Sequence, residues 1–309
     1  MSVRTLFSQS LKRASSRALA RPGLASNPAI IQRREKGTQP NYEGHVPLNW
    51  FEHAFMFAGA SYMSLFHPAR GDMVAAVADL TSGPVLPGLR DKMLSSPEGR
   101  RILKERPRIN TQTVDMHKLA LLPEGSFGNA YVTWLERCGV TPDTREPVRA
   151  YILTNDIIMN VEMGLTTKVH YVDDPELAYV LQRYRECHDF YHCIVNLPVN
   201  VESELAVKFF EFANLGLPMA GFAAAFGHIR LNSTKRARLF QEYVPWAMKC
   251  GSSSQSLITV YWEERWEQDV AELRKELGIW EAPEARWGKA LSEAKAAAEK
   301  KRTAAEQVR

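Results

Sequence analysis

Apolar residues recur every three or four positions along most of the chain, which is the spacing of one face of an α-helix. Gly and Pro, which end helices, divide these stretches. We predict helices at Asp72–Leu80, at Pro97 to Pro107, at Gly125–Cys138, at Val148–Gly164 and at Leu257–Leu277. No segment alternates strongly between apolar and polar residues, and no internal repeat is visible. The pattern therefore predicts an all-α fold with a single multi-helix domain over residues 42–281.

A further long helix is expected to begin at Asp173-Asp174-Pro175-Glu176, where acids and a proline favour a helix N-terminus. It continues through LAYVLQRYRECHDFYH. The Leu257–Leu277 stretch carries one stripe of large apolar side chains, made of Ile258, Trp262, Trp266, Val270, Leu273 and Leu277. We expect this stripe to lie in the core or against another helix.

Two apolar runs, Ala54–Phe66 and Leu215–Phe226, are shorter than the roughly 20 residues that span a bilayer. The second run is also interrupted by Gly216, Pro218 and Gly221. We therefore predict that both are buried core helices, although an enzyme with an apolar substrate would need such surfaces too.

The two ends of the chain differ in charge from its body. Residues 1–34 contain no Asp or Glu and carry +7, whereas the whole chain carries +4, so the remainder carries −3. Residues 1–41 resemble a mitochondrial transit peptide with a linker, since they are rich in Arg, Ser and Ala; the alternative is a disordered tail without function. Residues 282–309 predict an exposed helical or disordered tail. An acidic body argues against nucleic-acid binding, and the irregular spacing of Cys138, Cys187, Cys193 and Cys250 argues against a disulfide framework.

Candidate metal ligands lie in HDFYHCIVNLPVNVESE, from His188 to Glu204. His188 and His192 are one helical turn apart, so their imidazoles can bind one ion. Asp189 lies about 100° round the helix from His188 and could be a ligand or could orient a histidine.

Glu204 cannot share this helix, because it would lie about 18 Å further along the axis than His192. Pro198 is midway between His192 and Glu204 and disfavours the helical conformation at Leu197. If the chain reverses near Pro198 and Asn200, an antiparallel helix places Glu204 level with His192. The donor set then suits zinc with an open position, and it also suits ferrous iron. The alternative is that these histidines are ordinary helix residues, with Glu202 and Glu204 on a solvated face.

Sequence blocks beyond this motif resemble a known family. HDFYH, eleven residues and Glu204 match HDxxH-x11-E, the motif of the mitochondrial ubiquinone (coenzyme Q) biosynthesis protein four family. The blocks ERPRI, LPEGSFGNAYV, DDPELAYVLQRYRECHD, LGLPMAGFAAAFGHIRL and PWAMKCG are similar to that family in the same order. The likeness covers about His45 to Trp280.

The resemblance implies a helical protein with a zinc-like ion bound by His188, Asp189, His192 and Glu204. It implies peripheral attachment to the matrix side of the mitochondrial inner membrane, in a complex with other ubiquinone-biosynthesis proteins. It also implies removal of the C1 carboxyl of 4-hydroxy-3-methoxy-5-polyprenylbenzoate, with polyprenylated benzoate or quinone intermediates as ligands. A homodimer is an open possibility.

The expected chemistry follows from the substrate's hydroxyl, which is para to the carboxylated carbon. Loss of the phenolic proton moves electron density to that carbon, which then takes up a proton and releases carbon dioxide. An oxidative route would favour a redox metal over zinc. Arg183, Arg185 or Arg230 could hold a carboxylate, although surface ion pairing is the more common role of an arginine.

Two other functions remain open. The first is a non-catalytic scaffold that binds the polyprenyl tail through Leu215–Phe226 and uses the metal only for structure. The second is a metal-dependent hydrolase related by analogy to HExxH peptidases, in which Asp189, with its shorter side chain, replaces the usual Glu.

Overall fold

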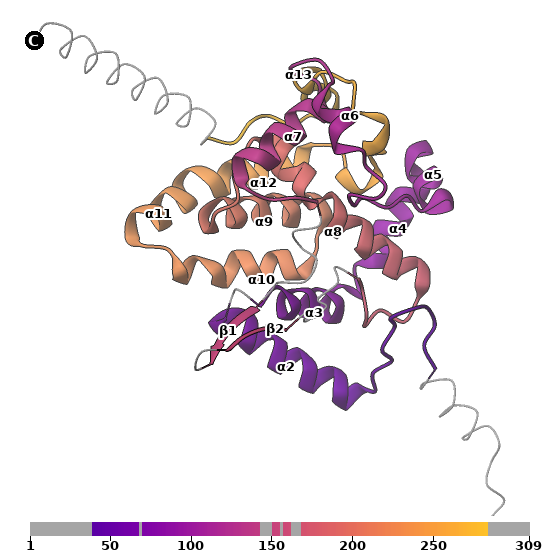
Figure 1. Ribbon diagram of the computed structural model, residues 1–309, viewed down its shortest axis with the longest axis vertical. Coiled ribbons are helices and arrows are strands. Elements are labelled where there is room, and N and C mark those ends of the chain that lie inside the picture. The colour runs from indigo at the N-terminus through magenta and orange to yellow at the C-terminus, as the bar shows by residue number, and fades with distance from the viewer. Residues whose placement is uncertain (1–38, 68–69, 143–149, 155–156, 162–167, 284–309) are drawn as a thin grey trace, which may run out of the picture. The chain divides into compact units, whose positions relative to one another are not determined.

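The computed structural model describes residues 39–67, 70–142, 150–154, 157–161 and 168–283. Those from Pro40 onward belong to one compact unit that is almost entirely helical (Figure 1). Its first helices are α2 (Trp50–Phe66), α3 (Gly71–Ser82), α4 (Leu86–Ser95), α5 (Pro97–Glu105), α6 (Met116–Ala120) and α7 (Phe127–Cys138). The later helices are α8 (Pro175–Val195), α9 (Val201–Leu215), α10 (Pro218–Gly227), α11 (Ser233–Arg238), α12 (Val244–Ser253) and α13 (Val270–Leu277). The predicted all-α fold is confirmed.

Short helical turns join the later helices. They are the 3₁₀ turns η1 (His228–Arg230), η3 (Leu257–Thr259) and η4 (Trp262–Glu264), and the π-helical turn η2 (Leu239–Tyr243). All four cysteines are free thiols, as expected. None of the described helices combines the length and the apolar character needed to cross a bilayer. The predicted transit peptide and tail lie outside the described residues, apart from 39–41 and 282–283.

Helix α8 runs through the core and is buried on nearly every side. It packs against α4, α5, α7 and η3, while α9 packs against α10 and α12. The side chain of Asp174 accepts hydrogen bonds from the backbone N–H groups of Glu176 and Leu177, at 2.8 and 2.9 Å, and Pro175 occupies the first turn. This is the N-terminus that the sequence predicts.

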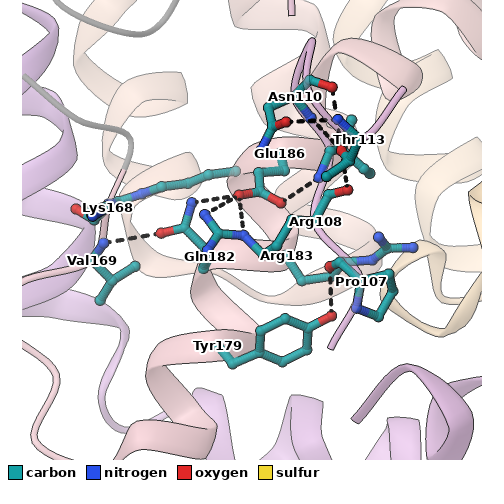
Figure 2. A network of polar contacts seen from close by, with 12 residues as sticks. Pro107, Arg108, Asn110, Thr113, Lys168, Val169, Tyr179, Gln182, Arg183 and Glu186 are labelled. Carbon is teal, nitrogen blue, oxygen red and sulfur yellow. Dashed lines mark hydrogen bonds and ion pairs between the residues drawn. The ribbon is translucent and has the colours of Figure 1, made fainter. Parts of the chain in front are cut away.

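A polar network fixes the first half of α8 to the segment that follows α5 (Figure 2). Glu186 accepts hydrogen bonds from Arg108 Nε at 2.7 Å, Gln182 Nε2 at 2.9 Å and the backbone N–H of Ile109 at 2.9 Å. Tyr179 donates to the carbonyl of Pro107 at 3.0 Å. These contacts set the position of the helix that carries both histidines of the motif.

The helix predicted at Val148–Gly164 is wrong. Strands β1 (Ala150–Thr154) and β2 (Ile157–Val161) form an antiparallel pair in which Ala150 is opposite Val161 and Thr154 is opposite Ile157. Asn155 and Asp156, residue types that favour turns, separate the two strands in the sequence, and β-branched residues are frequent on both sides of them.

The single helix predicted at Leu257–Leu277 is also wrong, because this stretch contains η3, η4 and α13 instead. Backbone hydrogen bonds to the start of α7 replace helical ones here: Phe127 N–H donates to Gln268 O at 2.8 Å, and Gly128 N–H donates to Trp266 O at 2.9 Å. The stripe is nevertheless buried or partly buried, so the prediction that it belongs to the core is confirmed.

The apolar run Ala54–Phe66 was expected to be a buried core helix, and this expectation is wrong. It forms most of α2, but Ala60 is the helix's only fully buried residue. The other run, in α10, is partly buried through Met219, Ala220 and Ala224, while Phe222 and Phe226 are exposed. A helix that is apolar all round gives no indication of which side faces the core.

Candidate metal centre

Helices α8 and α9 form the antiparallel hairpin that the sequence predicts. Helix α8 ends at Val195 because Asn196 adopts the left-handed conformation, with φ of 59°, and Leu197 N–H bonds back to His192 O at 2.9 Å. Asn196, rather than Pro198, therefore ends the helix. Asn200 caps α9 by accepting from the N–H of Ser203 at 3.0 Å.

The hairpin brings His188, His192 and Glu204 together. The two imidazole Nε2 atoms are 3.1 Å apart. Glu204 Oε2 lies 3.4 Å from His188 Nε2, and Glu204 Oε1 lies 3.3 Å from His192 Nε2. Among the described residues these three form a group that could hold one metal ion.

The separations of these atoms fit a bound ion. Two nitrogens bound at about 2.0–2.1 Å in tetrahedral geometry are roughly 3.3 Å apart. Two imidazoles and one carboxylate leave a position open for substrate or water, which suits zinc, and the same donors suit ferrous iron. Both histidines are buried, whereas the side chain of Glu204 is 31% exposed, so the open side lies next to Glu204.

Each histidine is oriented by a group on its other ring nitrogen. His188 Nδ1 contacts the carboxylate of the fully buried Glu211, and His192 Nδ1 lies 3.3 Å from the carbonyl oxygen of Leu197. Acceptors at Nδ1 favour the tautomer whose Nε2 lone pair is free to bind a metal. Trp134 Nε1 donates to the same Leu197 carbonyl at 2.8 Å and fixes its position.

Three residues around His188 were not predicted from the sequence as part of the site: Tyr184, Lys208 and Glu211. Tyr184 donates to Glu211 Oε2 at 2.7 Å, and Lys208 Nζ donates to the same oxygen at 2.6 Å. Lys208 Nζ also lies 3.1 Å from His188 Nδ1. Helical spacing was the available signal, since Tyr184 is one turn before His188 and Glu211 is two turns after Glu204.

The groups around the site favour the ionised form of both glutamates. Burial opposes ionisation of Glu204, but the neighbouring His192 and His188 outweigh burial and keep its pKa well below the usual range. Burial likewise opposes ionisation of Glu211, and His188 with Lys208 lowers its pKa to about 2. Ionised carboxylates are the forms that bind a cation or accept a hydrogen bond from imidazole.

Asp189 is buried but is not a member of the convergent group. It projects from α8 about 100° away from His188. Burial raises the pKa of the nearby Cys193 thiol to about 12, and the charge of Asp189 adds a smaller contribution in the same direction. Its role as a fourth ligand stays a prediction.

The three candidate carboxylate-binding arginines have other partners. Arg183 is buried and pairs with Glu263, with Nη2 2.7 Å from Oε2, and Arg185 is buried and pairs with Asp79. Neither of these ion pairs lies on the surface, so the expectation that Arg183 and Arg185 form surface ion pairs is wrong. Arg230 donates to the carbonyls of Ser64 and Leu65 at the end of α2.

Comparison with known proteins gives one consistent family. The model of the protein family described as "Coenzyme Q (ubiquinone) biosynthesis protein Coq4" matches residues 42–157 and 159–283 of this chain. A Coprinopsis cinerea protein named "Ubiquinone biosynthesis protein COQ4, mitochondrial" is 66% identical over 269 residues, covering 87% of this chain and 85% of that protein. A Meyerozyma guilliermondii protein of the same name is 47% identical, covering 81% and 73%.

A solved structure shares the fold. The crystal structure of a Nostoc punctiforme protein superposes with a TM-score of 0.53 at 20% sequence identity, covering 74% of this chain and 98% of that one. At this identity the likeness concerns the arrangement of the helices.

Proposed function

Because this chain belongs to the Coq4 family of coenzyme Q (ubiquinone) biosynthesis proteins, we propose that its metal centre removes the C1 carboxyl of 4-hydroxy-3-methoxy-5-polyprenylbenzoate. A role in ubiquinone biosynthesis follows from the family, and the reaction is the proposal. The observation that supports it is the convergence of His188, His192 and Glu204 on one point with a partly exposed side. The product is 2-methoxy-6-polyprenylphenol when the route is not oxidative.

The roles of the protein's own groups follow from the geometry. His188, His192 and Glu204 would hold the ion, proposed to be zinc, with ferrous iron as the alternative. When bound, the ion supplies Lewis-acid polarisation of a substrate oxygen. Glu211 and the Leu197 carbonyl keep the two imidazoles in the metal-binding tautomer. The partly exposed Glu204 marks the side from which the phenol ring approaches.

The location and the partners form part of the same proposal. The relatives are named mitochondrial, and we place this protein on the matrix side of the inner membrane, in a complex with other ubiquinone-biosynthesis proteins. The polyprenyl tail is expected to lie on apolar surface near α10, since Phe222 and Phe226 are exposed there. A non-catalytic scaffold would use the same surface, so binding of the tail does not separate the two functions.

Measured turnover distinguishes an enzyme from a non-catalytic scaffold. Purified protein loaded with zinc or with ferrous iron is mixed with a short-tailed head group labelled in its carboxyl, and released carbon dioxide is counted, with the metal-free protein as the control. Metal-dependent release supports the enzyme. If fully loaded protein with either metal releases nothing while still binding the head group, the scaffold function is correct.

A further inference from the structure

Helix α2 carries an apolar stripe on the side that faces away from the protein. Phe51, Phe55, Tyr62 and Phe66 follow helical spacing, so they lie on one side, and each is between 60% and 72% exposed. The opposite side packs against α3 through the buried Ala60. An amphipathic helix of a soluble protein normally turns its apolar stripe inward, so an outward stripe of this size marks a binding surface.

A second exposed stripe belongs to α10 and η1. Phe222, Phe226 and Ile229 are exposed, whereas Met219, Ala220 and Ala224 on the other side are buried. Both helices pack against α3, which lies between them (Figure 1). Arg230 donates to Ser64 O at 2.6 Å and to Leu65 O, so the ends of the two stripes meet. We call these seven exposed side chains, Phe51, Phe55, Tyr62, Phe66, Phe222, Phe226 and Ile229, the α2–α10 surface.

Positive charge adjoins the α2–α10 surface. Residues 217–240 contain no Asp or Glu but contain four cations, Arg230, Lys235, Arg236 and Arg238. Arg238 pairs with Glu202, whereas Lys235 and Arg236 are exposed on α11 directly after the apolar stripe. Apolar side chains next to Lys and Arg suit the surface of an anionic bilayer, where rings enter the headgroup layer and cations contact phosphate.

Aromatic composition favours lipid over a protein partner. Trp50, at the start of α2, is 82% exposed, and Tyr62 lies further along the same helix. Trp and Tyr concentrate where a membrane meets water, because each combines an apolar ring with a polar atom.

Helix α10 packs against α9, the helix that carries Glu204. A Cβ placed on Gly227 would lie 2.3 Å from Cδ2 of Leu205, so the end of α10 packs tightly against the residue that follows Glu204. Glu204 is the exposed edge of the candidate site.

We propose that the α2–α10 surface docks on an anionic lipid bilayer, with its aromatic side chains in the headgroup layer and Arg230, Lys235 and Arg236 against lipid phosphates. This inference names a surface for the peripheral attachment in the proposed function. It does not depend on the catalytic proposal, because vesicle binding requires neither metal nor turnover.

The test is co-sedimentation of the full chain with phosphatidylcholine vesicles, with and without about one third phosphatidylserine. The Phe55→Ser/Tyr62→Ser variant removes exposed rings from α2, and its matched control is Leu94→Ser/Leu121→Ser, which removes exposed apolar side chains elsewhere. The charge variant is Lys235→Glu/Arg236→Glu, and its control is Lys104→Glu/Lys275→Glu, at exposed positions of α5 and α13. Thermal melts check that every variant folds.

Both surface variants should bind anionic vesicles at least about tenfold more weakly than the parent, and both controls should bind like the parent. The basic leader is present in every variant, so parent-like binding by the surface variants would assign binding to the leader and overturn the proposal. Equal loss in a control and its matched variant would also overturn it. If Phe55→Ser/Tyr62→Ser separates a dimer into monomers without weakening vesicle binding, the surface is an interface between two copies instead.

Discussion

His188 Nδ1 is hydrogen-bonded to the carboxylate of Glu211, a residue of α9 with no exposed surface. Because Glu211 also accepts from Tyr184 and Lys208, its carboxylate is held in one place. The imidazole is thereby fixed with Nε2 toward His192 and Glu204. An arrangement of carboxylate, histidine and metal of this kind raises ligand basicity as well as setting ring orientation.

Glu211→Gln should weaken metal binding by roughly 10- to 100-fold, because the amide cannot replace the charge that favours the metal-binding tautomer. Affinity is measured by competition with a zinc chelator. The control is Glu136→Gln, at an exposed position of α7. Unchanged affinity in Glu211→Gln would show that Glu211 only fills space.

His188→Ala and His192→Ala should each remove most of the bound metal while the helical fold survives, since α8 is held by many contacts besides these rings. Metal content is determined by elemental analysis, and circular dichroism follows the fold. His53→Ala, at an exposed position of α2, is the control and should retain its metal. Full metal occupancy in both site variants would refute the assignment.

Asp189→Asn should reduce metal affinity less than Glu204→Gln does, because Glu204 belongs to the convergent group and Asp189 does not. The same chelator competition compares the two variants. We expect at least about tenfold weakening for Glu204→Gln and only a few-fold change for Asp189→Asn. The opposite order would make Asp189 a ligand, as the family motif implies.

Arg183→Met should destabilise the protein by about 3 kcal/mol without changing its metal content, since it leaves Glu263 without its buried partner. Urea unfolding measures the loss. Arg101→Met breaks the exposed pair with Glu264 and should cost at most about 1 kcal/mol. If Arg183→Met were as stable as the parent but bound the substrate carboxylate poorly, Arg183 would be a substrate residue after all.

The convergence of His188, His192 and Glu204 was predictable because its geometry is local. The spacing of His188 and His192 depends only on the helical repeat, and the return of the chain depends on turn residues between two short helical segments. Proline chemistry pointed to Pro198, whereas Asn196 ends the helix two residues earlier. The error did not move Glu204, since both residues lie in the same loop.

The residues that contact His188, namely Tyr184, Lys208 and Glu211, were harder to predict because their positions depend on how α8 and α9 pack. In the sequence, Glu211 looks like an ordinary polar residue of an amphipathic helix. Only the packing of α8 against α9 shows that it is buried. Packing also interrupts the helix predicted at Leu257–Leu277. Between Trp266 and Val270, backbone hydrogen bonds to the start of α7 override the local preference for a helix. The outward position of the aromatic side chains on α2 could not be predicted, because a helix that is apolar on most sides does not show which side faces the core.

Chemistry at the proposed metal centre is tested most directly by Glu204→Gln in cells at normal protein level. The substitution keeps the shape of Glu204 but removes the charge of a proposed ligand, while the α2–α10 surface is unchanged. Ubiquinone and the accumulated carboxylated precursor are quantified, together with assembly of the proposed complex with other ubiquinone-biosynthesis proteins. We predict loss of ubiquinone with accumulation of the precursor and intact assembly. Normal ubiquinone with normal assembly would contradict the catalytic function.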